Sequence, residues 1–224
     1  MGVRAPALAG ILPPGAVGAE VQEAEGETAE IAAALSEEEL AAIANASEGR
    51  RREFSGGRAC ARSALGMLGL EPASLPVGSY GAPAWPAGIV GSITHKGSYR
   101  AAAVARADSL HGIGLDAEVD AELPPGVLGR LACPEEIEGI EALIARHPGH
   151  AWDRLLFSAK EAAVKAAEPL GLGSPGLATT KVRLDARERS FGASARFGEA
   201  HNVSVVGAWE WRLGLILVAA WMSP

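Results

Sequence analysis

The pattern of apolar and polar residues predicts two helices in the first third of the chain. Ser36 stands before an acidic run, and Glu39 follows three residues later. This capping box predicts a helix over residues 36–45. A longer, arginine-rich helix is expected over residues 47–68. Residues 69–88 contain many prolines and glycines, which predicts a loop.

Three short apolar segments follow this loop and are predicted to be strands. Their bounds are Ile89–Thr94, Tyr99–Arg106 and Gly112–Glu118. Because short polar stretches connect them, we expect an antiparallel meander.

The second half of the chain repeats this order of helices followed by strands. Helices are predicted from Pro134 to Ala145 and from Ala151 to Glu168, where Pro169 ends the pattern. Three further strand segments are predicted: 181–184, 194–197 and 209–222, the last with a turn near Gly214. The pattern therefore indicates an α+β protein with two halves, residues 1–115 and 116–224.

Composition narrows the classes of function. The 224 residues carry a formal net charge of −7, which argues against nucleic-acid binding because that function usually needs a basic surface. No segment has the ~20 apolar residues that span a bilayer, and Pro13 and Pro14 interrupt a signal-like N-terminal run. Cys60 and Cys133 fit no metal-ligand pattern, so we expect reduced thiols in a cytoplasmic protein.

Two carboxylates stand close together in the strand "GIGLDAE". Asp116 and Glu118 are two residues apart, so their side chains point to the same face of an extended chain. Their repulsion must be offset by a proton, a basic neighbour or a metal ion, unless this edge of the sheet is simply solvated.

The helix predicted over residues 151–168 carries a third carboxylate. Its apolar arc contains Trp152, Leu155, Leu156, Ala159, Ala163, Ala166 and Ala167. Its polar side contains Arg154, Ser158, Glu161, Lys165 and Glu168, with Lys160 at the border. Glu161 and Lys165 could form an ordinary surface ion pair. Alternatively, Glu161 could join the two strand acids, whose strand begins in the other half of the chain, in an all-oxygen site, which Mg²⁺ prefers.

His95 follows an apolar strand and precedes a glycine-serine turn. It could be a structural histidine, or it could donate to a phosphate together with the Thr94 hydroxyl. The pattern does not decide between these roles.

Four segments, taken in order, resemble the Sfp/EntD-type 4′-phosphopantetheinyl transferases, with the actinobacterial branch closest in appearance. They are "GRRREFSGGRACARSAL" (49–65), "GAPAWPAGIVGSITH" (81–95), "GIGLDAE" (112–118) and "WDRLLFSAKEAAVKA" (152–166). The resemblance implies a fold of two similar α+β halves, each a small antiparallel sheet with helices. It also implies Mg²⁺-dependent transfer of phosphopantetheine from coenzyme A to a serine of an acyl or peptidyl carrier protein, with release of 3′,5′-ADP.

The resemblance also assigns roles to individual residues. Asp116, Glu118 and Glu161 match the acids that bind the metal, and the Ala117 carbonyl or a water would fill another position. Glu161 would act as a metal ligand, as the base that deprotonates the carrier serine, or as both. The residues matched to coenzyme A binding are Arg50, Arg58, Thr94, His95, Asp116, Lys160, Glu161 and Lys165. Lys165 would also stabilise charge in the transfer step.

The chain departs from the family pattern at three positions. Val77 and Tyr80 stand where relatives often carry basic residues, and Val164 stands where an aromatic residue is common. We keep two alternatives: another Mg²⁺-dependent phosphotransferase, although no P-loop motif is present, and a non-catalytic module that binds coenzyme A or a carrier. A monomer that binds neither nucleic acid nor membranes is expected, and the pathway of its carrier is left open.

Overall fold

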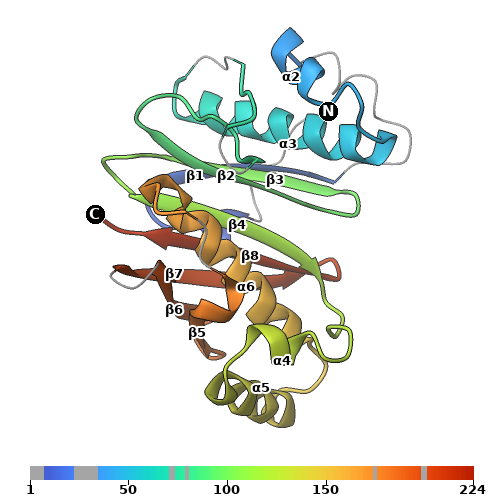
Figure 1. Cartoon of the computed structure of the whole chain (residues 1–224), viewed down its shortest axis with the longest axis vertical. Coiled ribbons are helices and arrows are strands. Elements are labelled where there is room, and N and C mark those ends of the chain that lie inside the picture. Colours follow the sequence, from blue (N-terminus) through green and yellow to red (C-terminus); the bar gives the residue numbers. More distant parts are fainter. Residues whose placement is uncertain (1–7, 23–34, 71–73, 79–80, 174–175, 198–200) are drawn as a thin grey trace. The chain divides into compact units, whose positions relative to one another are not determined.

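The computed structural model describes residues 8–22, 35–70, 74–78, 81–173, 176–197 and 201–224 (Figure 1). The chain is α+β and divides into two compact units, residues 1–110 and 111–224. Within the described residues, no helix is long and apolar enough to cross a membrane.

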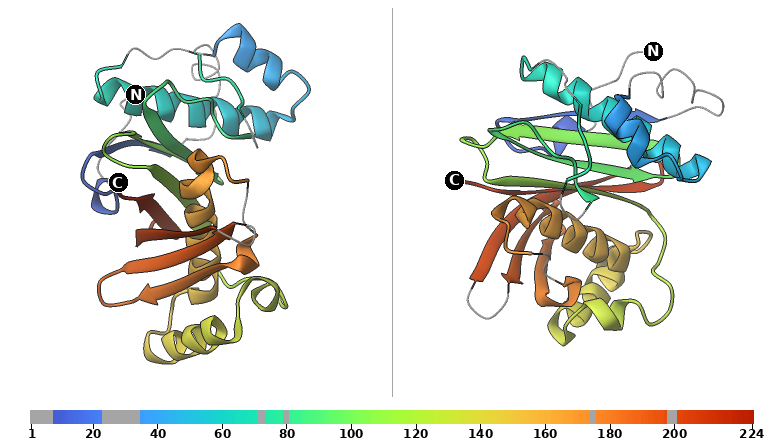
Figure 2. Two further views of the ribbon diagram at one scale, coloured as in Figure 1. Left: turned by 60° about the vertical axis from the view of Figure 1, so that its left-hand side comes forward. Right: turned by 45° about the horizontal axis from the view of Figure 1, so that its top comes forward.

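The first unit is built on a three-stranded antiparallel sheet in the order β1-β3-β2. Its strands are β1 (Ala16–Gln22), β2 (Ile89–Lys96) and β3 (Tyr99–Arg106). Helix α3 (Glu48–Met67) lies along one face of this sheet (Figure 2). Short helices η1 (Leu8–Gly10) and α2 (Glu37–Ala42) also belong to this unit.

Helix α3 and strands β2 and β3 confirm the corresponding predictions, and α2 begins with the predicted capping box at Ser36. Strand β1 was not predicted, because its sequence "AVGAEVQ" is short and follows a proline pair that suggests a turn. Its pairing partner, β3, lies some eighty residues later in the chain. Tyr80, a noted departure from the family pattern, lies outside the described residues, whereas Val77 is exposed.

The second unit is built on a five-stranded antiparallel sheet in the order β4-β8-β7-β6-β5. The strands are β4 (Gly112–Val119), β5 (Thr180–Asp185), β6 (Ser190–Phe197), β7 (His201–Arg212) and β8 (Leu215–Met222). The helices are α4 (Leu128–Leu131), α5 (Pro134–Arg146) and α6 (Trp152–Ala167), with turns η3 (Glu168–Leu170) and η4 (Leu177–Thr179). Helix α6 packs on this sheet and contributes most of one side of its core.

The meander predicted for the first three strands is wrong at its third strand. β4 pairs with β8 at the end of the chain, in the register Gly112 to Met222, and not with β3. The connection before β4 is short, as in a hairpin, but Ser109 and Leu110 both donate to the Arg106 carbonyl oxygen. This closes a helical turn that ends the β2–β3 pair.

The β7–β8 hairpin confirms the turn predicted near Gly214. Leu213 and Gly214 both have positive φ, 53° and 74°, which is the backbone of a two-residue hairpin turn that matches the twist of its strands. Leucine rarely adopts this conformation, so the hairpin imposes it on Leu213.

Candidate functional site

One face of β4 is directed at helix α6. Gly112, Gly114, Asp116 and Glu118 alternate along the strand and share this face. A Cβ atom added at Gly114 would lie 2.0 Å from the Ala162 carbonyl oxygen, so strand and helix backbones meet there. The glycines bring the helix into contact with the strand, and the two acids come directly after this contact.

Side chains of α6 hold both strand acids. The Ser158 hydroxyl donates to Asp116 Oδ2 over 2.7 Å, and Lys165 Nζ donates to Asp116 Oδ1 over 2.7 Å. Arg154 Nη1 lies 3.3 Å from Glu118 Oε2. Arg154, Ser158 and Lys165 are four and seven residues apart, which places them on the same side of the helix. The sequence placed all three on the polar side and assigned Lys165 to the same site as the strand acids, but it gave no reason to link Arg154 or Ser158 to the strand.

Glu161 is linked to this group because the charges of its members act on the Glu161 carboxyl. Burial raises the pKa of its carboxyl, the charges of Asp116 and Glu118 raise it further, and Lys165 opposes the shift. The structure therefore brings Asp116, Glu118, Glu161 and Lys165 together between β4 and α6. Both elements lie in the second unit, so the expectation that the strand acids and the helix acid come from different halves is wrong.

The donors of this group are carboxylate oxygens, which are the ligands that a hard divalent cation such as Mg²⁺ prefers. As they stand, no three His, Cys, Asp or Glu side chains among the described residues surround a common point. The Lys165 ammonium instead supplies positive charge at Asp116 Oδ1. The three carboxylates have the donor chemistry of a hard cation, but in this arrangement they do not surround one. Ala117 lies between the two acids, in register with Leu217.

Lys160 is not part of this group. Its side chain is fully buried, and Nζ donates to Glu136 Oε2 over 2.8 Å. It also donates to the carbonyl oxygens of Leu177 and Thr180, at 3.2 and 2.5 Å. These three acceptors match the three N–H bonds of an ammonium group. Helical arithmetic put Lys160 at the border of the polar face, whereas the structure places it in the interior, joining α6 to α5 and β5.

Replacing Lys160 by methionine should therefore destabilise the protein by about 3–5 kcal/mol, because the buried Glu136 carboxylate would lose its cation. The exposed Lys181 on β5 offers a matched control, and Lys181→Met should change the free energy of unfolding by less than about 0.5 kcal/mol. Urea unfolding of both variants measures the difference. Equal stability of the two would show that the Lys160–Glu136 pair contributes nothing.

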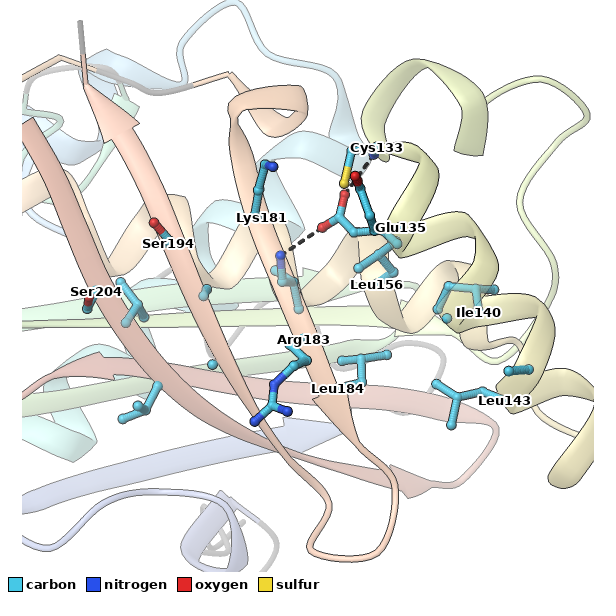
Figure 3. A pocket seen from close by; sticks show the side chains of 18 of the residues that line it. Cys133, Glu135, Ile140, Leu143, Leu156, Lys181, Arg183, Leu184, Ser194 and Ser204 are labelled. Atoms are coloured by element: carbon cyan, nitrogen blue, oxygen red, sulfur yellow. Dashed lines mark hydrogen bonds between the residues drawn. The ribbon is translucent and has the colours of Figure 1, made fainter. Parts of the chain in front are cut away.

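A cavity of about 950 Å³ lies between α5 and strands β5 to β7 (Figure 3). Apolar side chains such as Ile140, Leu143 and Val182 line it. It contains none of the acids of the β4–α6 group. Its Glu136 is the residue that accepts from Lys160. The cavity is therefore separate from the candidate site.

In the first unit, His95 and Arg50 come together. Arg50 Nη1 lies 3.3 Å from His95 Nε2, and Glu53 lies 3.4 Å from Arg50 and 3.7 Å from His95 Nδ1. Ile93, on the same face of β2 as His95, would contact a Cβ at Gly57 of α3, so this face meets the helix. Thr94 is buried and points to the opposite face, away from His95.

Arg58 is also separate from this pair. It is buried, its Nε donates to the Leu75 carbonyl oxygen over 2.7 Å, and its guanidinium lies 4.3 Å from the Phe54 ring centroid. Burial lowers its pKa to about 10, against the opposing charge of Glu39. Its contacts join α3 to the loop after it, whereas the side chain of Arg50 is half exposed.

Each of the two units matches a domain model of the same protein family. Residues 37–105 match the 4′-phosphopantetheinyl transferase N-terminal domain, and residues 112–207 match the 4′-phosphopantetheinyl transferase superfamily. The 4′-phosphopantetheinyl transferase Npt of Nocardia iowensis is 47% identical over 161 residues, which cover 71% of this chain and 68% of that protein. This chain belongs to the 4′-phosphopantetheinyl transferase superfamily.

Two further relatives in this superfamily are actinobacterial. The transferase Svp of Streptomyces mobaraensis is 52% identical over 133 residues, 59% of this chain and 54% of its own length. The transferase PptT of Mycobacterium tuberculosis is 45% identical over 135 residues, 59% of this chain and 58% of its own length. The chain thus spans roughly half to two thirds of these relatives, between 54% and 68%.

Proposed function

We propose that this chain transfers the 4′-phosphopantetheine group of coenzyme A to a serine of an apo carrier protein, with Mg²⁺ as cofactor, and releases 3′,5′-ADP. The observation that carries the proposal is the group of Asp116, Glu118, Glu161 and Lys165 between β4 and α6. These four residues lie inside the stretch that matches the transferase superfamily.

The reaction forms a bond from the serine oxygen to the phosphorus of phosphopantetheine and breaks the bond from that phosphorus to 3′,5′-ADP. The serine must lose its proton, and a carboxylate whose pKa is raised toward neutrality suits this task. Glu161 is such a group. It would accept the serine proton directly or through a water, or it would serve as a metal ligand.

Negative charge on the diphosphate must be neutralised as the leaving group departs. Lys165, whose side chain is 27% exposed, can turn from Asp116 toward a phosphate oxygen. Asp116, Glu118 and Glu161 would hold Mg²⁺, which would supply further positive charge to the diphosphate. Lys160 and Arg58 have a structural role in this proposal, because both side chains are buried and hydrogen-bonded in the interior.

Arg50 and His95 are proposed to bind the 3′-phosphate of coenzyme A. His95→Ala should weaken coenzyme A binding about tenfold, since each charge-assisted hydrogen bond contributes about 1.5–3 kcal/mol. Binding of 3′-dephospho-coenzyme A should change by less than twofold. Calorimetric titration of both ligands measures this, and an equal loss for the two would remove His95 from the 3′-phosphate.

The carrier would present its serine from an acidic helix, so a local basic or apolar surface is required on this acidic protein. We further propose that the chain acts as a monomer in the cytoplasm, where coenzyme A is available and where Cys60 and Cys133 would stay as the free thiols observed.

Incubation with coenzyme A, Mg²⁺ and several apo carrier proteins tests the proposed function. Intact mass spectrometry should find each accepted carrier heavier by one phosphopantetheine group. The gain should disappear when Mg²⁺ is chelated. A chain that binds coenzyme A yet modifies none of the carriers would instead be a non-catalytic binding module.

A further inference from the structure

The two carboxylate oxygens of Asp116 accept hydrogen bonds from two side chains that differ in their exposure to solvent. Oδ2 accepts from the hydroxyl of Ser158, a residue with no exposed surface. Oδ1 accepts from Lys165, whose side chain is 27% exposed. One oxygen is therefore bound to a fully buried group, and the other is bound to a partly exposed one.

We propose that Ser158 is a positioning residue that fixes Asp116 with Oδ1 alone available, so that Asp116 binds the cation through that one oxygen after Lys165 has withdrawn. This inference rests on the proposed function, since it concerns the same cation site. Ser158 itself touches neither the cation nor coenzyme A in this arrangement.

The residues around Ser158 support a specific role for its hydroxyl in binding Asp116. Ala159, Ala162 and Ala163 are fully buried neighbours on α6, so this helix is generally filled with alanine where it packs closely. Alanine also favours a helix more than serine does. A buried hydroxyl needs a hydrogen-bond partner, and serine in a helix commonly bonds to a carbonyl one turn earlier. The Ser158 hydroxyl instead donates across to β4.

The geometry also explains how Asp116 would keep its orientation if Lys165 moved to a phosphate. Lys165 Nζ has a second acceptor in the Leu115 carbonyl oxygen at 3.0 Å, on the same strand. If the ammonium turns toward a phosphate, Asp116 keeps its orientation through Ser158. Hydrogen bonds that orient the ligands of a metal ion commonly change its affinity by 10- to 100-fold.

Mn²⁺ binding to the full chain tests the inference. The free ion is counted by electron paramagnetic resonance with coenzyme A at saturation, and a blank holds coenzyme A alone. Ser158→Ala should weaken Mn²⁺ binding at least tenfold. Ser158→Thr, which keeps the hydroxyl, should stay within about threefold of the unaltered chain. Thr180→Val is the matched control, because it removes another buried hydroxyl of the same unit and should leave Mn²⁺ binding unchanged.

The outcomes separate this inference from the proposed function. If the unaltered chain binds Mn²⁺ and Ser158→Ala binds it equally well, Ser158 does not position Asp116, and the cation site stands. If the unaltered chain takes up no Mn²⁺ beyond the coenzyme A blank, the proposed cation site fails and this inference fails with it. Should Ser158→Ala not fold, Ser158→Cys keeps the side-chain size with a weaker donor, and it must also weaken Mn²⁺ binding.

Discussion

Replacing Glu161 by glutamine is expected to lower turnover of carrier protein by about 10²- to 10⁴-fold, the usual contribution of a general base. At neutral pH the same change is expected to raise the Tm of the protein. Turnover should fall because an amide cannot accept the proton of the carrier serine. The Glu161 carboxylate is half-buried beside two other carboxylates, and an uncharged amide removes that repulsion.

The sign of the stability effect follows from the direction of the pKa shift. Burial, with Asp116 and Glu118, raises the pKa of Glu161 in the folded state. The folded state therefore binds this proton more tightly than the unfolded state does. The favourable contribution is fully present below the ordinary glutamate pKa of about 4.3 and is lost as pH rises through the higher folded pKa. The advantage of Glu161→Gln over the unaltered chain should grow across that window.

Thermal unfolding between pH 4 and pH 8, together with the rate of carrier modification, measures both effects on one variant. Glu168→Gln is the matched control, because burial also raises the pKa of Glu168 at the end of the same helix. This control should gain stability and keep its turnover. Turnover of Glu161→Gln near that of the unaltered chain would remove Glu161 from the chemistry.

Replacing Gly114 by alanine is expected to destabilise the protein by about 3 kcal/mol, at the upper end of the usual range for overpacking. The new Cβ would lie 2.0 Å from the Ala162 carbonyl oxygen and 2.6 Å from the Ala166 backbone nitrogen. Both are backbone atoms of α6, so no side chain can turn away to relieve the contact. The helix must move from β4, and the Ser158 and Lys165 bonds to Asp116 must lengthen.

Gly192 on β6 provides the control for this change, because a Cβ atom there would meet nothing within 4 Å. Gly192→Ala should be neutral or slightly stabilising, since it reduces the freedom of the unfolded chain. Urea unfolding and the carrier assay compare the two variants. A Gly114→Ala protein as stable and active as Gly192→Ala would show that the close contact of β4 and α6 is not needed.

Much of the candidate site follows from local sequence patterns. The i, i+2 spacing of Asp116 and Glu118 in a strand places both carboxylates on one face, and the spacing of Glu161 and Lys165 places them together on α6. Both patterns depend only on the geometry of one element. For this reason they predict the relevant faces without knowledge of the fold.

The remaining features depend on partners far away in the chain. Lys160 lies at the border of the helical pattern, and only Glu136 on α5 and the Thr180 carbonyl on β5 determine that it turns inward. Arg58 likewise is buried because it donates to the Leu75 carbonyl oxygen and forms an ion pair with Glu39. The pairing of β4 with β8 joins segments about a hundred residues apart, which no local pattern specifies.

A crystal structure of the chain with coenzyme A and Mg²⁺ tests the central proposal most directly. We expect the cation to bind carboxylate oxygens of Asp116, Glu118 and Glu161, at about 2.0–2.1 Å, together with the diphosphate of coenzyme A. Lys165 should then be found on a phosphate oxygen and away from Asp116 Oδ1. A diphosphate bound elsewhere, with Lys165 still paired to Asp116 and no cation between β4 and α6, would contradict the proposal.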